Sequence, residues 1–245
     1  MSKANKKKVT VAVLCAALVT TIVAGGSLAY LTDSASRTNK INVTTDLDVD
    51  IDEGDWPDPD DEPDLLPGDI YEKKPTVTTD NNVYYRFKVT YIDQADDSII
   101  TDADRIALIE KAIKYDPDHA ALPVDGTYTE AEVEAAALAT FNETNYIKVA
   151  ADDAANEGYN YYFYYKDAED YIFATTDEGA PLFTTLVFPS DWSNNAVHSE
   201  IITLGKFDIK LDAEAIQADN NPCDDDDDNA FIAWFNDNYT APAQP

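Results

Sequence analysis

The chain has 245 residues, of which 48 are acidic and 17 are basic, and its formal net charge is −31. This balance disfavours nucleic acid as a partner, because phosphate binding requires clustered lysine and arginine, and it disfavours a bare anionic membrane surface for the same reason. Hydrophobic residues make up 44% of the chain and 15 residues are tyrosines, so the composition allows a packed core and excludes a chain that is disordered throughout.

Residues 1–29 have the three parts of an export signal. Lysines precede an apolar run from Val9 to about Ala24, and Ser27-Leu28-Ala29 forms a small-x-small cleavage site. The predicted cleavage residues are Ser27, Ala29 and Tyr30, and Tyr30 becomes the new N-terminus. Because four lysines leave with the signal, the mature chain keeps 13 basic and 48 acidic residues, a net charge of −35.

An uncleaved membrane anchor is the alternative, since Val9 to Leu31 is long enough to span a bilayer. In that case the protein touches the membrane only through this signal. The absence of a basic stop after Leu31 favours cleavage. Cys15 leaves with the signal, so the mature chain has only Cys223 and no internal disulfide. We predict an incidental surface thiol at Cys223, with an intermolecular link as the alternative.

Residues 40–52 alternate between apolar and polar side chains, which predicts a strand with one buried and one solvated face. Residues 54–67 are rich in aspartate and proline, which predicts an exposed acidic loop. This loop could bind calcium weakly, and simple solvation is the alternative. The calcium candidates are Asp58, Asp60, Asp61, Glu62 and Asp64. An EF-hand beginning at Asp48 is excluded, because its sixth position is glutamate instead of glycine.

A second alternating strand is predicted over residues 83–91, after a turn at residues 80–82. The period then changes over about 101–141, where we predict a helical insertion. Thr101-Asp102-Ala103-Asp104 resembles the N-cap of a first helix, and Thr129 with Glu132 forms a capping box that opens a second helix reaching about Phe141.

Strands resume over residues 146–149, 159–166, 182–188 and 206–213, and residues 171–174 are predicted to form a hairpin with the second of these. A short amphipathic helix is predicted over residues 229–238. Many strands in an antiparallel-like pattern predict a mainly β fold, a jelly roll or β-sandwich with inserted short helices. We therefore expect a single domain over residues 30–245.

Catalytic motifs are thinly represented in the sequence. His119 and His198 lie far apart and outside any H-E-x-x-H pattern, and we predict that both occupy surface loops. The chain has no G-x-S-x-G elbow and only eight glycines. We therefore predict no catalytic residues and no enzymatic activity, and no cofactor other than weakly bound calcium.

Several segments resemble the TasA/camelysin (CalY) family of exported proteins of Gram-positive bacteria. The resemblance is carried by residues 25–33 at the cleavage region, residues 38–51, Pro67-Gly68-Asp69, the strand at residues 84–89, and residues 207–219 followed by Ala233-Trp234. It implies a jelly-roll fold, processing by a dedicated SipW-type signal peptidase, and secretion to the extracellular matrix or the cell surface. Some members are called metallopeptidases, but no metal-ligand motif of this chain matches that label.

The family resemblance also implies a structural role, as a subunit of biofilm-matrix fibres that binds copies of itself. In such fibres the mature N-terminus of one subunit completes the sheet of the next, a process called donor-strand complementation. The expected donor segment is residues 30–43, with Tyr30, Leu31, Ile41 and Val43 as assembly residues, while residues 47–51 stay in their own sheet. A cell-surface adhesin on the same fold and a camelysin-like secreted metallopeptidase are the alternatives.

Overall fold

A computed structural model describes residues 49–52, 67–167, 170–174, 179–192, 203–218, 223 and 227–239. The predicted signal peptide, the predicted donor segment and nearly all of the predicted acidic loop lie outside these ranges.

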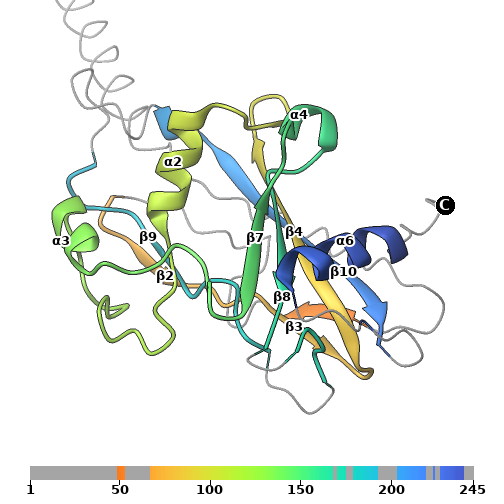
Figure 1. The fold of residues 1–245 in the computed structure, drawn as a ribbon. Coiled ribbons are helices and arrows are strands. Elements are labelled where there is room, and N and C mark those ends of the chain that lie inside the picture. Colours follow the sequence, from red (N-terminus) through yellow and green to blue (C-terminus); the bar gives the residue numbers. More distant parts are fainter. Residues whose placement is uncertain are drawn as a thin grey trace, which may run out of the picture.

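The described strands form three antiparallel sheets (Figure 1). The largest sheet has the strand order β10 (Phe207–Gln217), β4 (Val83–Asp93), β8 (Tyr161–Tyr165) and β7 (Tyr146–Ala150), and β5 (Ser98–Ile99) pairs with the end of β4. The second sheet has the order β2 (Ile70–Glu72), β9 (Thr185–Val187) and β6 (Ile113–Lys114). The third joins β1 (Val49–Asp52) to β3 (Thr76–Thr79).

The prediction of a mainly β fold with short helices is confirmed, and the jelly-roll connectivity is not confirmed. The described helices are α2 (Ala103–Ala112), α3 (Glu130–Ala135), α4 (Ala154–Glu157) and α6 (Asp228–Asn238). Asp102 caps α2, and Thr129 with Glu132 closes the predicted capping box of α3. None of the helices in the described ranges is long and apolar enough to cross a membrane.

Two details of the predicted helical insertion are wrong. The second helix ends at Ala135 instead of about Phe141, because Ala137 adopts a left-handed backbone conformation, with φ of 51°, that a helix cannot continue through. The insertion also contains a strand, since β6 pairs with β9 and thereby joins this region to the second sheet.

The predicted hairpin between residues 159–166 and 171–174 is also replaced by a different pairing. Phe173 forms an antiparallel bridge with Val83, at the beginning of β4, and their main-chain groups exchange two hydrogen bonds of 2.8 and 3.0 Å. On either side of the predicted turn, the Asp167 N–H donates to the Asp170 carbonyl at 2.7 Å. The segment therefore continues the sheet along the free part of β4.

The main hydrophobic core lies on the inner face of the largest sheet. Alternate residues of β4 point into it, namely Val83, Tyr85, Phe87, Val89 and Tyr91, and each is at most 1% exposed. The alternate residues of β10 that pair beside them are buried in the same cluster, as are residues of α2 and β9. The predicted period of two over residues 83–91 is therefore confirmed.

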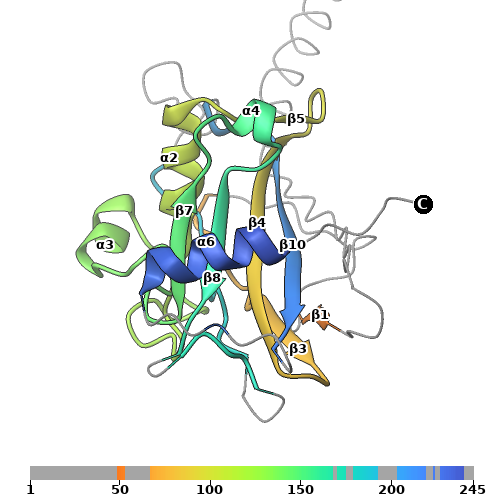
Figure 2. The same cartoon turned by 45° about the vertical axis from the view of Figure 1, so that its right-hand side comes forward.

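The outer face of the largest sheet is buried too, which the alternation did not predict. Helix α6 lies across this face, over β4 and β8 (Figure 2). Phe231 and Phe235 of the helix are fully buried, and they pack against Tyr84, Tyr164 and Tyr171. The ring of Phe231 stacks on that of Tyr171, with centroids 4.0 Å apart and planes 9° apart. The C-terminal helix therefore makes the sheet a middle layer.

We expect replacement of Phe231 by alanine to lower the free energy of unfolding by about 3–5 kcal/mol, since it removes a buried aromatic ring and leaves a cavity beneath α6. Chemical denaturation followed by circular dichroism measures this change. Ala233→Ser, at an exposed position of the same helix, is the matched control and should stay within about 0.5 kcal/mol. Equal stability of the two variants would show that the helix is not anchored at Phe231.

Candidate functional site: the two outer edges of the largest sheet

The register between β4 and β10 decides which main-chain groups of β10 point away from the sheet. The two strands pair over all 11 residues of β10. Hydrogen bonds at the ends of the ladder join Lys206 to Gln94 and Ala218 to Asn82. Hydrogen-bonded positions alternate in an antiparallel pair. The even-numbered residues of β10 therefore face β4, and the odd-numbered ones present their N–H and C=O groups to the other side.

The outward-facing main-chain groups of five residues form what we call the β10 edge: Phe207, Ile209, Leu211, Ala213 and Ala215. Within the described part of the chain, these groups have no hydrogen-bonding partner. The five residues span about 27 Å at the usual rise of a strand. A row of unpaired donors and acceptors of this length is a template for another strand.

The side chains of the β10 edge point into the main core and are between 3% and 6% exposed. A strand added here would therefore extend the sheet beside the core, and its own alternate side chains would be covered on the same face. Ile51 of β1 is 8% exposed and belongs to this core as well. The edge thus has the polar main chain and the apolar border that strand addition requires.

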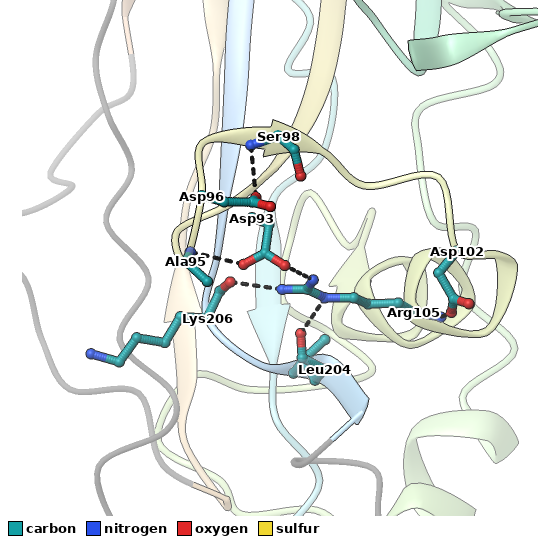
Figure 3. A network of polar contacts seen from close by, with 8 residues as sticks. All are labelled: Asp93, Ala95, Asp96, Ser98, Asp102, Arg105, Leu204 and Lys206. Atoms are coloured by element: carbon teal, nitrogen blue, oxygen red, sulfur yellow. Dashed lines mark hydrogen bonds and ion pairs between the residues drawn. The ribbon is translucent and has the colours of Figure 1, made fainter.

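Hydrogen bonds and an ion pair of Arg105 fix the main chain at the beginning of the β10 edge (Figure 3). The Arg105 side chain of α2 donates to the carbonyl oxygens of Leu204 at 2.6 Å and Lys206 at 2.8 Å, and it pairs with the Asp93 carboxylate at the end of β4. The Arg105 guanidinium lowers the pKa of Asp93, chiefly by hydrogen bonding. Gly205 lies between the two carbonyls with φ of 60°, and a Cβ there would come within 3.1 Å of the guanidinium. The chain therefore enters β10 along one fixed path.

A buried ion pair supports the middle of β10 from the outer face. Arg86 of β4 and Glu214 of β10 pair across the ladder at 2.6 Å, and their side chains are only 6% and 10% exposed. The guanidinium also donates to the Tyr164 hydroxyl at 2.7 Å and to Asn236 of α6. It lies 3.6 Å from the centroid of the Tyr162 ring. One arginine thus joins the edge strand, the sheet and the covering helix.

The pKa shifts around Arg86 have opposing causes. Burial lowers the pKa of Arg86, but the Glu214 carboxylate with the tyrosines opposes burial, and the net direction is upward. Burial raises the pKa of Tyr162 to about 12, although the Arg86 cation opposes that rise. The guanidinium therefore stays charged beneath the helix.

The other edge of the largest sheet belongs to β7. Hydrogen bonds of 2.9 Å join Asn145 to Lys166 and Ala151 to Asn160, so the odd-numbered residues face β8. Tyr146, Lys148 and Ala150 present their main-chain groups outward, without a partner in the described ranges. This edge is shorter than the β10 edge and carries a charged side chain, because the Lys148 ammonium pairs with Glu110 of α2 at 2.8 Å.

The predicted site residues lie outside the described ranges. These are Ser27, Ala29 and Tyr30 at the cleavage site, Leu31, Ile41 and Val43 of the donor segment, and the calcium candidates Asp58, Asp60, Asp61, Glu62 and Asp64. The end of the first alternating segment is described, and residues 49–52 pair with β3 of the same chain. The prediction that residues 49–51 stay in their own sheet is therefore confirmed.

His119 lies in a loop, as predicted, but its side chain is only 15% exposed; His198 lies outside the described residues. The Nε2 atom of His119 lies 3.5 Å from Glu72, and its Nδ1 atom lies 3.3 Å from the Thr185 hydroxyl. The described residues contain no group of three or more His, Cys, Asp or Glu side chains that could hold a metal. His119 and Glu72 alone do not make the donor set of a catalytic metal site.

Cys223, predicted to be an incidental surface thiol, is free and partly buried. It packs against the aromatic cluster beneath α6, and its N–H donates to the Tyr84 hydroxyl at 3.1 Å.

Sequence reasoning missed Arg86 as a support of the edge strand. The available signal was its place in the sequence, after Tyr84 and Tyr85 and before Phe87. A cation within an aromatic strand requires a partner if its face is covered.

We expect Glu214→Gln to destabilise the fold by about 3–5 kcal/mol, since the Arg86 cation would then be buried without its counter-charge. The double variant Arg86→Met with Glu214→Leu should lose clearly less, because it removes both charges. Urea denaturation of the two variants measures the difference. A double variant that is at least as unstable as Glu214→Gln would refute this account of the pair.

Comparisons with known proteins give one match. The family described as camelysin metallo-endopeptidase matches residues 4–97, from the predicted signal through β1 to the end of β4 and the following turn. No curated protein and no solved structure matches the chain. Over residues 4–97 the chain is therefore similar to the camelysin family, in agreement with the resemblance to TasA and camelysin noted in its sequence.

Proposed function

We propose that the protein is a secreted structural subunit of extracellular matrix fibres, in which the N-terminal segment of one copy adds a strand to the β10 edge of the next. The observation that carries this proposal is the β10 edge itself, with five consecutive outward positions that lack a main-chain partner in the described part of the chain. The predicted export signal and the family match to residues 4–97 support the same function.

The surface properties of the described residues favour association through main-chain groups. Val124 is the only large hydrophobic side chain there that is exposed, at 43%. The described ranges therefore offer no apolar patch of the kind that usually drives association between copies. Strand addition satisfies polar main-chain groups, and it works on a surface with charged side chains.

The N-terminal segment has the pattern that a donor strand needs. Ile41 and Val43 alternate with polar residues, and a slip of one residue would turn the apolar set outward, so the pattern selects one register. Because β1 is paired with β3 of its own chain, the donor segment ends before Val49. The donor residues of this proposal are Tyr30, Leu31, Ile41 and Val43.

The predicted signal determines when the donor segment can reach another copy. While the predicted signal is attached, its apolar run holds the donor segment at the membrane. Cleavage after Ala29 by a SipW-type signal peptidase would release that segment, and it would then reach a second copy in the extracellular matrix or at the cell surface. With a net charge near −35, mature copies repel one another until salt or divalent cations screen them.

The description of the family favours one second candidate, a metallo-endopeptidase. The described residues supply no metal-ligand group, and the remaining acidic residues lie outside them. Cleavage of a protein substrate that stops when a chelator is added would favour this candidate over the structural one. Loss of the same cleavage in the variants Glu72→Gln and His119→Ala would favour it as well.

The first test of the fibre proposal removes the donor. We expect the mature chain from Tyr30 to form fibres in physiological salt, and a chain that begins at Asp48 to stay monomeric, because it keeps β1 and loses residues 30–47. Negative-stain electron microscopy and sedimentation measure both. Fibres of similar length from the two chains would rule out N-terminal donation.

The second test blocks the acceptor. Proline at position 213 removes the outward N–H of the β10 edge, and an edge strand tolerates proline at such a position. We expect mature Ala213→Pro to remain folded and to form no fibres, and Ala150→Pro, which alters the β7 edge in the same way, to form them normally. If the opposite pattern is seen, the acceptor is β7 and not β10.

A further inference from the structure

Two hollows lie beside β7, and both are also lined by residues of β8 or next to it, Asn160 and Tyr161 in one and Phe163 and Lys166 in the other. Together with the β7 edge we call them the β7 groove. One hollow, of about 310 Å³, lies between Ile106 of α2 and Ala150. The other, of about 450 Å³, lies between Glu110 of α2 and residues 146–148. Helix α2 therefore forms one wall of the groove and β7 forms the other, with residues of β8 lining the space between them.

The main chain of β7 determines what shape of ligand fits the groove. The outward N–H and C=O groups of Tyr146, Lys148 and Ala150 recur at every second residue, and in the described ranges they have no partner. A row with this spacing is satisfied by an extended peptide that pairs as one more strand. It is not satisfied by a helix, whose own main-chain groups are bonded internally.

The charges around the groove determine what composition of ligand fits it. Glu143 lies at one end, Asp152 and Asp153 lie at the other, and all three are exposed. The two lysines of the groove already have carboxylate partners, since Lys148 pairs with Glu110 at 2.8 Å and Lys166 pairs with Asp228 at 3.3 Å. The uncompensated charge is therefore negative.

We propose that the β7 groove binds an extended, lysine- or arginine-rich segment of a different protein, which pairs with β7 as an added strand. The occupant is a different protein because this chain has 17 basic residues against 48 acidic ones, so a second copy brings mostly repulsion to this groove. The inference does not depend on fibre formation, because it concerns the strand at the opposite end of the sheet from β10.

The pair of Lys148 and Glu110 joins the two walls of the groove. Lysine on an edge strand is a common protection against unwanted pairing. With 35% and 24% of the two side chains exposed, this pair holds the walls together only weakly. An arriving basic segment can replace the Lys148 ammonium on the Glu110 carboxylate, and Lys148 then moves to solvent. The pair thus discourages neutral strands and admits cationic ones.

The experiment titrates fluorescently labelled ten-residue peptides into the mature chain and follows anisotropy at low ionic strength. The first peptide alternates valine with lysine, the second alternates valine with glutamate, and the third has the sequence of residues 38–47 of this chain. We expect the valine–lysine peptide to bind, its affinity to fall as salt is added, and the other two to bind at least about tenfold more weakly.

The variants locate the binding. Ala150→Pro removes one outward N–H and should weaken the binding of the valine–lysine peptide about tenfold. Ala213→Pro, the same change on the β10 edge, should leave the affinity for this peptide unaltered. Glu143→Lys with Asp152→Lys changes only exposed side chains and should weaken binding by roughly fivefold even if Ala150→Pro does not fold.

Three results would overturn the inference. The first is binding that neither Ala150→Pro nor the charge reversal weakens. The second is equal binding of the glutamate peptide. The third is tighter binding of the peptide from residues 38–47, which would make a second copy of this chain the occupant. Loss of fibres in Ala213→Pro with unchanged peptide binding would confirm that the two edges are separate sites.

Discussion

The antiparallel ladder between β4 and β10 is the constraint on which the rest of this structure depends. Its 11 residue pairs fix the register of the edge strand, and a shift by one residue would exchange the core-facing residues of β10 with Asp208, Lys210 and Asp212 on the outer face. The cost of burying those charges makes such a shift strongly unfavourable. The same register decides which main-chain groups of β10 point away from the sheet, so the core and the proposed acceptor edge are determined together.

Two arginine side chains hold the edge strand β10 in its place beside β4. Here Arg86 holds Glu214 of β10 from the outer face, and Asn236 and Tyr164 hold Arg86 in turn. At the other end, Arg105 holds the carbonyls on both sides of Gly205. Both braces act through side chains, so they leave the outward main-chain groups of β10 unobstructed.

The sequence predicted the local elements better than their arrangement. Alternation located β4, β7, β8 and β10 to within a few residues, and cap chemistry located α2 and the beginning of α3, because these signals depend on neighbours along the chain. The end of α3 was missed, since an alanine-rich run favours helix up to Ala137 and its left-handed conformation. Which strands lie at the edges, and that α6 covers Tyr84 and Tyr164, depend on long-range pairing that periodicity does not encode.

The two ends of the largest sheet differ in a way that fits two different partners. The β10 edge is long, its side chains belong to the core, and the strand it borders is held by two arginines, so the added strand needs apolar residues at alternate positions. The β7 edge offers three outward residues, carries Lys148, and lies against α2 among exposed carboxylates. A short pairing gives few hydrogen bonds, each of modest net value, so charge must supply much of the affinity there. Under the two proposals, apolar fit would select the strand of another copy at the β10 edge, and charge would select the strand of a different protein at the β7 edge.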